Sequence, residues 1–111
     1  MNTLSFRAAA FVAAAWLFTT GAAASEPRIN VLFLGDQGHH RPADRFEQIV
    51  PVLARRGIDL AYTEDLNNLN PSKLANYDAL LLYANIDRIE PAAATAVLDY
   101  VAAGHGFVPL H

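Results

Sequence analysis

Hydrophobic residues in this chain gather in short runs that alternate with longer, periodically spaced segments. Residues 29–34 are almost continuously apolar and stop at Gly35, which is typical of a strand covered on both faces. Residues 58–63, 77–83 and 106–110 contain three further strand-like runs, of which 77–83 is the most apolar. The pattern therefore predicts four short strands.

Two segments between these strands have the spacing of amphipathic helices. Residues 42–56 carry apolar side chains at i, i+3, i+4 and i+7, and Pro51 should kink this helix because it removes a backbone hydrogen bond. Residues 91–103 begin with a proline and end before a glycine, as helices often do. The face expected to be buried in the second helix consists of Ala94, Val97, Leu98 and Val101. Residues 64–76 are polar and turn-rich, with one short helical turn.

The order strand, helix, strand, loop, strand, helix, strand predicts a parallel sheet with right-handed crossovers. We predict a flavodoxin-like doubly wound α/β fold with strand order 2-1-3-4. The first, third and fourth strands should be central, the second should lie at an edge, and the two helices should cover opposite faces. A complete domain of this kind continues past a fourth strand, so we expect residues 25–111 to be its N-terminal part and the sheet to be incomplete.

Residues 1–24 have the pattern of a signal peptide rather than of a folded segment. A single charge at Arg7 precedes an uncharged run from Ala8 to Ala24, and the run ends in small residues that a signal peptidase needs. We expect cleavage before Ser25 and export to the periplasm or the extracellular space. A retained membrane anchor is the alternative, which the short, alanine-rich run disfavours.

Charge and cysteine content narrow the classes of function. The segment 25–111 contains seven basic and 11 acidic residues and no run of Lys or Arg. Nucleic acid is therefore not an expected partner, because phosphate binding needs clustered cations. The chain has no cysteine, so a packed core must stabilise it without disulfides even in an oxidising compartment.

Polar side chains follow three of the predicted strands, where the ligands of open parallel sheets bind. Asp36, His39 and His40 follow the first strand, Asn85 follows the third, and His111 follows the fourth. These five residues are the ligand-binding candidates of the sequence, and none has an assigned catalytic role.

Three parts of the sequence resemble the ThuA-like domain family. They are residues 31–36 followed by Gly38-His39-His40, residues 77–83, and residues 98–111 with their helix, Gly-His-Gly, apolar strand and Leu-His ending. The resemblance implies the class I glutamine amidotransferase-like fold and ligand-edge residues at His39 or His40 and at His111. The family is named for trehalose utilisation, and in related exported proteins such a domain resembles a module joined to haem-binding or sugar-dehydrogenase regions. Amidotransferase activity is not expected, because the chain lacks the cysteine that those relatives use.

Each candidate residue also has a purely structural interpretation, as a solvated loop or turn residue. Adjacent histidines point in different directions, so at most one of His39 and His40 should face a common site. One of them, with Asp36 and His111, has the ligand types of a first-row divalent ion, but the spacing matches no zinc pattern and we expect no metal site. Asp36 is more typical of a turn residue than of a base.

Two classes of function remain, together with the hypothesis that the chain is a truncated fragment without function. The chain could bind or process a sugar-related polar metabolite, which requires a pocket where the candidate residues converge. It could instead be a non-catalytic interaction module of a larger exported haem or dehydrogenase protein, in which case the same residues should be splayed along a flat edge. The sequence assigns no cofactor to either.

Overall fold

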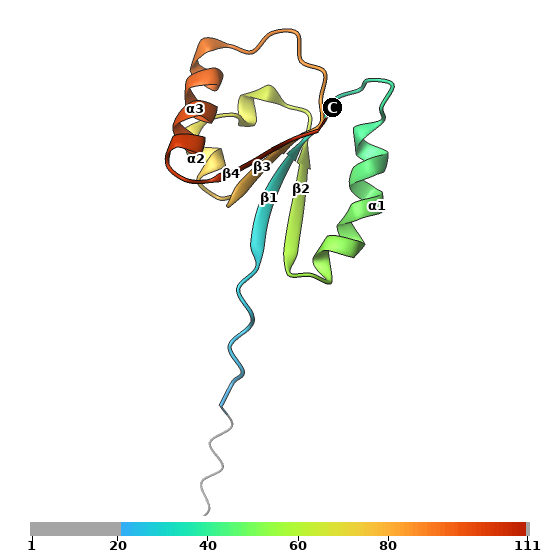
Figure 1. Cartoon of the computed structure of the whole chain (residues 1–111), viewed down its shortest axis with the longest axis vertical. Coiled ribbons are helices and arrows are strands. Elements are labelled where there is room, and N and C mark those ends of the chain that lie inside the picture. The colour runs from blue at the N-terminus through green and yellow to red at the C-terminus, as the bar shows by residue number, and fades with distance from the viewer. Residues whose placement is uncertain (1–20, 111) are drawn as a thin grey trace, which may run out of the picture.

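The computed structural model describes residues 21–110, and a four-stranded parallel sheet forms its centre (Figure 1). The strands are β1 (Ile29–Leu34), β2 (Ile58–Thr63), β3 (Ala79–Leu82) and β4 (Gly106–Pro109). Their order is β2-β1-β3-β4 and each neighbouring pair is parallel, which confirms the predicted α/β topology. The position of β4 differs from the prediction: within residues 21–110 it is an edge strand, because no described strand pairs with its outer side.

Two sequence predictions fall wholly or largely outside the described residues. The predicted signal peptide covers residues 1–24, of which residues 1–20 are not described, and His111 is not described either. Cleavage and export therefore stay predictions. No helix within residues 21–110 is long and apolar enough to cross a membrane.

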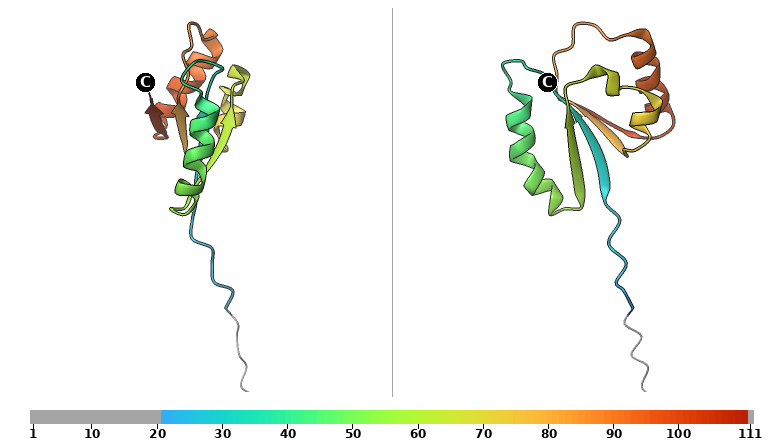
Figure 2. Two further views of the ribbon diagram at one scale, coloured as in Figure 1. Left: turned by 90° about the vertical axis from the view of Figure 1, so that its right-hand side faces the viewer. Right: turned by 180° about the vertical axis from the view of Figure 1, so that it is seen from behind.

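Helices cover both faces of the sheet, as predicted (Figure 2). Helix α1 (Pro42–Ala54) packs on one face, next to β1 and β2. The 3-10 helix η1 (Leu66–Asn68), helix α2 (Pro71–Leu74) and helix α3 (Pro91–Ala102) lie on the other.

Helix α1 begins at the predicted Pro42 and ends at Ala54, two residues before the predicted end. It ends there because the chain turns at Gly57, whose φ of 80° favours glycine, and enters β2. The helix is continuous through Pro51. Pro51 and Glu47, the residue one turn before it, are both exposed, so water can bind the carbonyl that the proline leaves unpaired.

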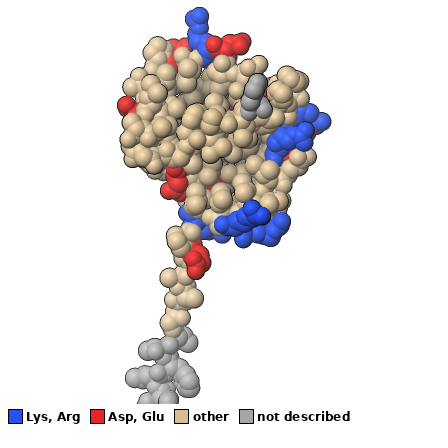
Figure 3. Space-filling view, viewed as in Figure 1, with Lys and Arg blue, Asp and Glu red and all other residues tan. Residues whose placement is uncertain are grey.

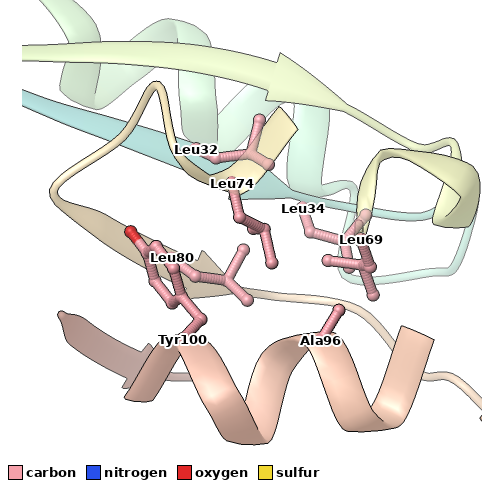
Figure 4. Close-up of a cluster of buried hydrophobic side chains, with 7 residues drawn as sticks. All are labelled: Leu32, Leu34, Leu69, Leu74, Leu80, Ala96 and Tyr100. Atoms are coloured by element: carbon pink, nitrogen blue, oxygen red, sulfur yellow. The ribbon is translucent and has the colours of Figure 1, made fainter. Parts of the chain in front are cut away.

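The face covered by α2 and α3 contains the larger apolar cluster (Figure 4). Its buried members are Leu32, Leu34, Leu69, Leu74, Leu80, Ala96 and Tyr100. The buried side of α3 is one residue out of register with the predicted side: Ala93, Ala96, Val97 and Tyr100 face the sheet, whereas Leu98 is 70% exposed. Alanines occur on several sides of α3, so the spacing of apolar residues alone does not determine which side is buried. Tyr100 selects it, because its ring is buried and its hydroxyl donates to the Tyr77 carbonyl at 2.9 Å.

The α1 face is built around the fully buried ring of Phe33. Phe46 of α1 contacts it edge-on, with ring centres 5.7 Å apart, and Tyr62 and Tyr83 pack beside it at 5.6 and 6.5 Å. This aromatic cluster ends before β4, where Val108 is 45% exposed. The α1 face is thus closed over β1 and β2 and open over β4.

Candidate functional site

Asp36 joins the loop after β1 to the loop after β3. Its Oδ1 accepts a hydrogen bond from the Gly38 N–H at 2.8 Å, and its Oδ2 accepts one from the Asn85 N–H at 2.5 Å. These two bonds, that from Asn85 first, hold the pKa of Asp36 below its usual value, and the nearby histidines add to the effect. Both carboxylate oxygens therefore accept hydrogen bonds from backbone N–H groups. This matches the interpretation of Asp36 as a turn residue and leaves it poorly suited to act as a base.

His39 and His40 lie together, contrary to the expectation that only one would face the site. Their ring centres are 4.0 Å apart with a tilt of 38°, and the His40 ring lies 5.8 Å from that of Tyr83. The expectation holds for extended backbone, where neighbouring side chains alternate. Here the backbone turns: the Arg41 N–H donates to the Gly38 carbonyl at 3.0 Å, and Arg41 adopts a left-handed conformation with φ 52°.

A pocket of about 260 Å³ lies beside these rings. It is lined by Asp36, His39, His40, Pro42, Tyr83, Ala84, Asn85 and Leu110. The pocket sits at the carboxyl ends of β1 and β3, which is the topological switch point in the strand order β2-β1-β3-β4. Four of the five candidate residues thus line one pocket, and the fifth, His111, lies outside the described residues.

The pocket has little formal charge. None of its lining residues is a lysine or arginine, and its one carboxylate is engaged by backbone N–H groups. Figure 3 shows a broad uncharged area on the face in view, with Lys and Arg at its top, right and lower margins. The groups available to a ligand are two imidazoles, the side-chain amide of Asn85 and the ring of Tyr83.

Sequence reasoning missed a second set of polar residues around the same loop. Glu64, just after β2, accepts a hydrogen bond from the Tyr62 hydroxyl at 2.7 Å and another from the Gln37 side-chain amide. Burial first, and then the bond to Glu64, raises the pKa of Tyr62 well above its usual value. Nothing in the local sequence indicates this set, because Gln37 and Glu64 are 27 positions apart.

The described residues do not assemble a metal site. Within residues 21–110 no group of three or more His, Cys, Asp or Glu side chains is arranged to hold an ion. Of the three ligands considered from the sequence, Asp36 is committed to the backbone and His111 is not described, which leaves the histidine pair.

Comparison with known proteins shows a likeness of fold to a solved structure. No protein-family model matches the chain, and no curated protein matches it. A solved structure of a protein described as ThuA-like, from Bacteroides uniformis, superposes with a TM-score of 0.60 and 23% sequence identity. The match covers 83% of this chain and 39% of that protein. The fold is therefore ThuA-like, and the chain spans about two-fifths of the protein it resembles.

Proposed function

We propose that this chain is an exported ThuA-like domain that binds a sugar-related polar metabolite in the pocket between β1 and β3. One observation carries the proposal: His39, His40 and Asn85, from two loops, converge on a single pocket. Binding pockets are concave and combine apolar walls with a few placed polar groups. A surface module without a ligand gives no reason for these side chains to converge.

The chemistry of the lining supports a neutral polyhydroxyl ligand. A neutral imidazole offers one donor and one acceptor, and the Asn85 side chain offers both as well. Hydroxyl groups need this mixture, whereas a phosphate or carboxylate ligand would favour Arg or Lys, and neither lines the pocket. Tyr83 and Leu110 add apolar surface against which the C–H face of a sugar ring could pack.

A specific observation favours the alternative of an interaction module joined to a haem-binding or dehydrogenase region. Phe107, Val108 and Leu110 in and after β4 are each 40–45% exposed, and Leu98 of α3 is more exposed still. Val108 and Leu110 lie on the same face of the sheet because strand side chains alternate, and exposed apolar residues that share a face are typical of contact surfaces. In that alternative the histidine pair has no ligand.

Titration of the chain from Ser25 onward with trehalose and with glucose tests the proposal. The imidazole Cε1–H resonances of His39 and His40 should shift with saturation, and His40→Ala should abolish binding. His105 is an internal control, because it stacks on Tyr100 with ring centres 4.1 Å apart and does not line the pocket. Equal shifts at His105, or none at either pocket histidine, would contradict the proposal.

In a separate titration without sugar, zinc alone should bind the chain weakly.

A further inference from the structure

The loop that carries His39 and His40 has few contacts of its own. Its residues from Gln37 to His40 are exposed, and one backbone–backbone hydrogen bond spans it, from the Arg41 N–H to the Gly38 carbonyl. The Gly38 N–H is bound by the Asp36 side chain. Segments with so few buried contacts open at low free-energy cost. Whatever holds this loop therefore decides where the two imidazoles lie.

Two anchors hold the loop, one on each side. Toward β3, Asp36 binds the Asn85 N–H. Toward β2, the Gln37 side-chain amide donates to Glu64, and the other oxygen of Glu64 accepts from the Tyr62 hydroxyl.

The anchor toward β2 rests on a rigid base. Tyr62 is the fifth residue of β2, and its ring packs against Phe33 and Phe46 with ring centres 5.6 and 5.2 Å apart. The same ring lies directly over Gly35, where a Cβ atom would be 2.6 Å from Cε2 of Tyr62. The hydroxyl that holds Glu64 is thus fixed by the aromatic cluster, while the other carboxylate oxygen of Glu64 accepts from the Gln37 side chain in the loop.

We infer that Glu64, which does not line the pocket, is a positioning residue for it: its carboxylate connects the fixed Tyr62 hydroxyl to Gln37 and so sets the position of the His39–His40 loop. The effect on ligand binding rests on the proposed function, but the effect on the loop does not. Glu64 touches neither imidazole in the hydrogen bonds of the described residues and is not assigned a role in catalysis.

A reciprocal exchange tests this assignment. Gln37→Glu places two carboxylates against each other and should release the loop. Adding Glu64→Gln should restore the contact with the roles reversed, because the new amide can donate to position 37 while its oxygen accepts from Tyr62. Glu47→Gln on α1 is the matched control, since Glu47 is exposed and has no hydrogen bond to another described side chain.

The primary measurement is the ¹⁵N order parameter of residues 37–40 without ligand. It should fall from about 0.85 to below about 0.6 in Gln37→Glu and return in the double variant. The Kd for trehalose should rise about fivefold in Gln37→Glu, the loss of roughly one hydrogen bond, and recover likewise. Thermal midpoints should change little, because both side chains are exposed.

Two results would overturn the inference: a rigid loop in Gln37→Glu, or a loop that stays mobile in the folded double variant. An unresponsive wild-type chain in the trehalose titration would defeat the proposed function alone, because the order parameters still report on Glu64.

Discussion

The two ends of the sheet use acidic residues for different purposes. At the amino end, Asp59 binds Arg28 through two contacts of 2.6 and 2.7 Å, and Asp78 accepts the Asn30 N–H at 2.7 Å. Each of these acids fastens the beginning of β1 to a neighbouring strand or to the turn before one. The amino end is thereby closed by its own charged groups.

At the carboxyl end, acids fasten loops instead of strands. Asp36 joins the loops after β1 and β3, and Glu64 binds the loop after β1 through the Gln37 side chain. Neither imidazole of the loop between them has a hydrogen-bond partner within residues 21–110, and both face the pocket. Acidic residues thus close the amino end of the sheet, whereas at the carboxyl end they leave room for a ligand. The reason is that the loops diverge around the switch point only at the carboxyl end.

The largest effect is expected from Gly35→Ala at the carboxyl end. The added Cβ would lie 2.6 Å from a ring carbon of Tyr62, so the ring must move out of the aromatic cluster. The free energy of unfolding should fall by about 2 kcal/mol, as in other overpacked cores. Urea denaturation measures this. Combining the change with Tyr62→Leu should cost less than the sum of the two single changes, and strict additivity would show that no clash exists.

Asp36→Asn should have the next largest effect, about 1 kcal/mol at neutral pH, because the amide can accept only one of the two backbone hydrogen bonds well. The folded-state pKa of Asp36 lies below its ordinary value of 3.8. Its contribution is therefore fully present above that value and is lost as the pH falls through the lower, folded-state pKa.

Urea denaturation of both proteins from neutral pH to about pH 2 checks this dependence. The difference between wild type and Asp36→Asn should stay constant down to about pH 4 and shrink below it. A difference that grows on acidification would reverse the sign and contradict the assignment.

Asp78→Ala, at the amino end, should lower the free energy of unfolding by about 0.5 kcal/mol through loss of the bond to Asn30. The His39 and His40 resonances at the carboxyl end should not move in Asp78→Ala, so this variant separates the two ends of the sheet. A shift of either resonance would show that the two ends of the sheet are coupled.

Arg28→Ala should have the smallest effect. The ion pair with Asp59 is exposed, with 44% and 46% of the two side chains accessible, and such pairs contribute little to stability. A small fall in the thermal midpoint should disappear at about 1 M salt, where charges are screened over about 3 Å. A salt-independent fall would instead indicate the hydrogen bond from Arg28 to the Ala54 carbonyl.

Local patterns in the sequence determined most of the fold. The bounds of β1 and β2 and the start of α1 agree with those predicted, because strand runs and helix starts depend on neighbouring residues. The strand order followed from the alternation of elements. With that order, the rule that ligands bind beyond the carboxyl ends was enough to gather Asp36, Asn85 and one of the two histidines at one edge, but the turn at residues 38–41 was needed to bring both histidines to the pocket.

Tertiary structure decided what these patterns could not express. The buried side of α3 depends on where the Tyr100 hydroxyl finds the Tyr77 carbonyl, 23 positions away in the chain. The hydrogen bond from the Asn85 N–H to Asp36 joins residues 49 positions apart. The hydrogen bond that connects Glu64 to the histidine loop comes from Gln37. Contacts between residues so distant in the chain leave no periodicity in the sequence, and they form only once packing of the sheet has brought the strand ends together.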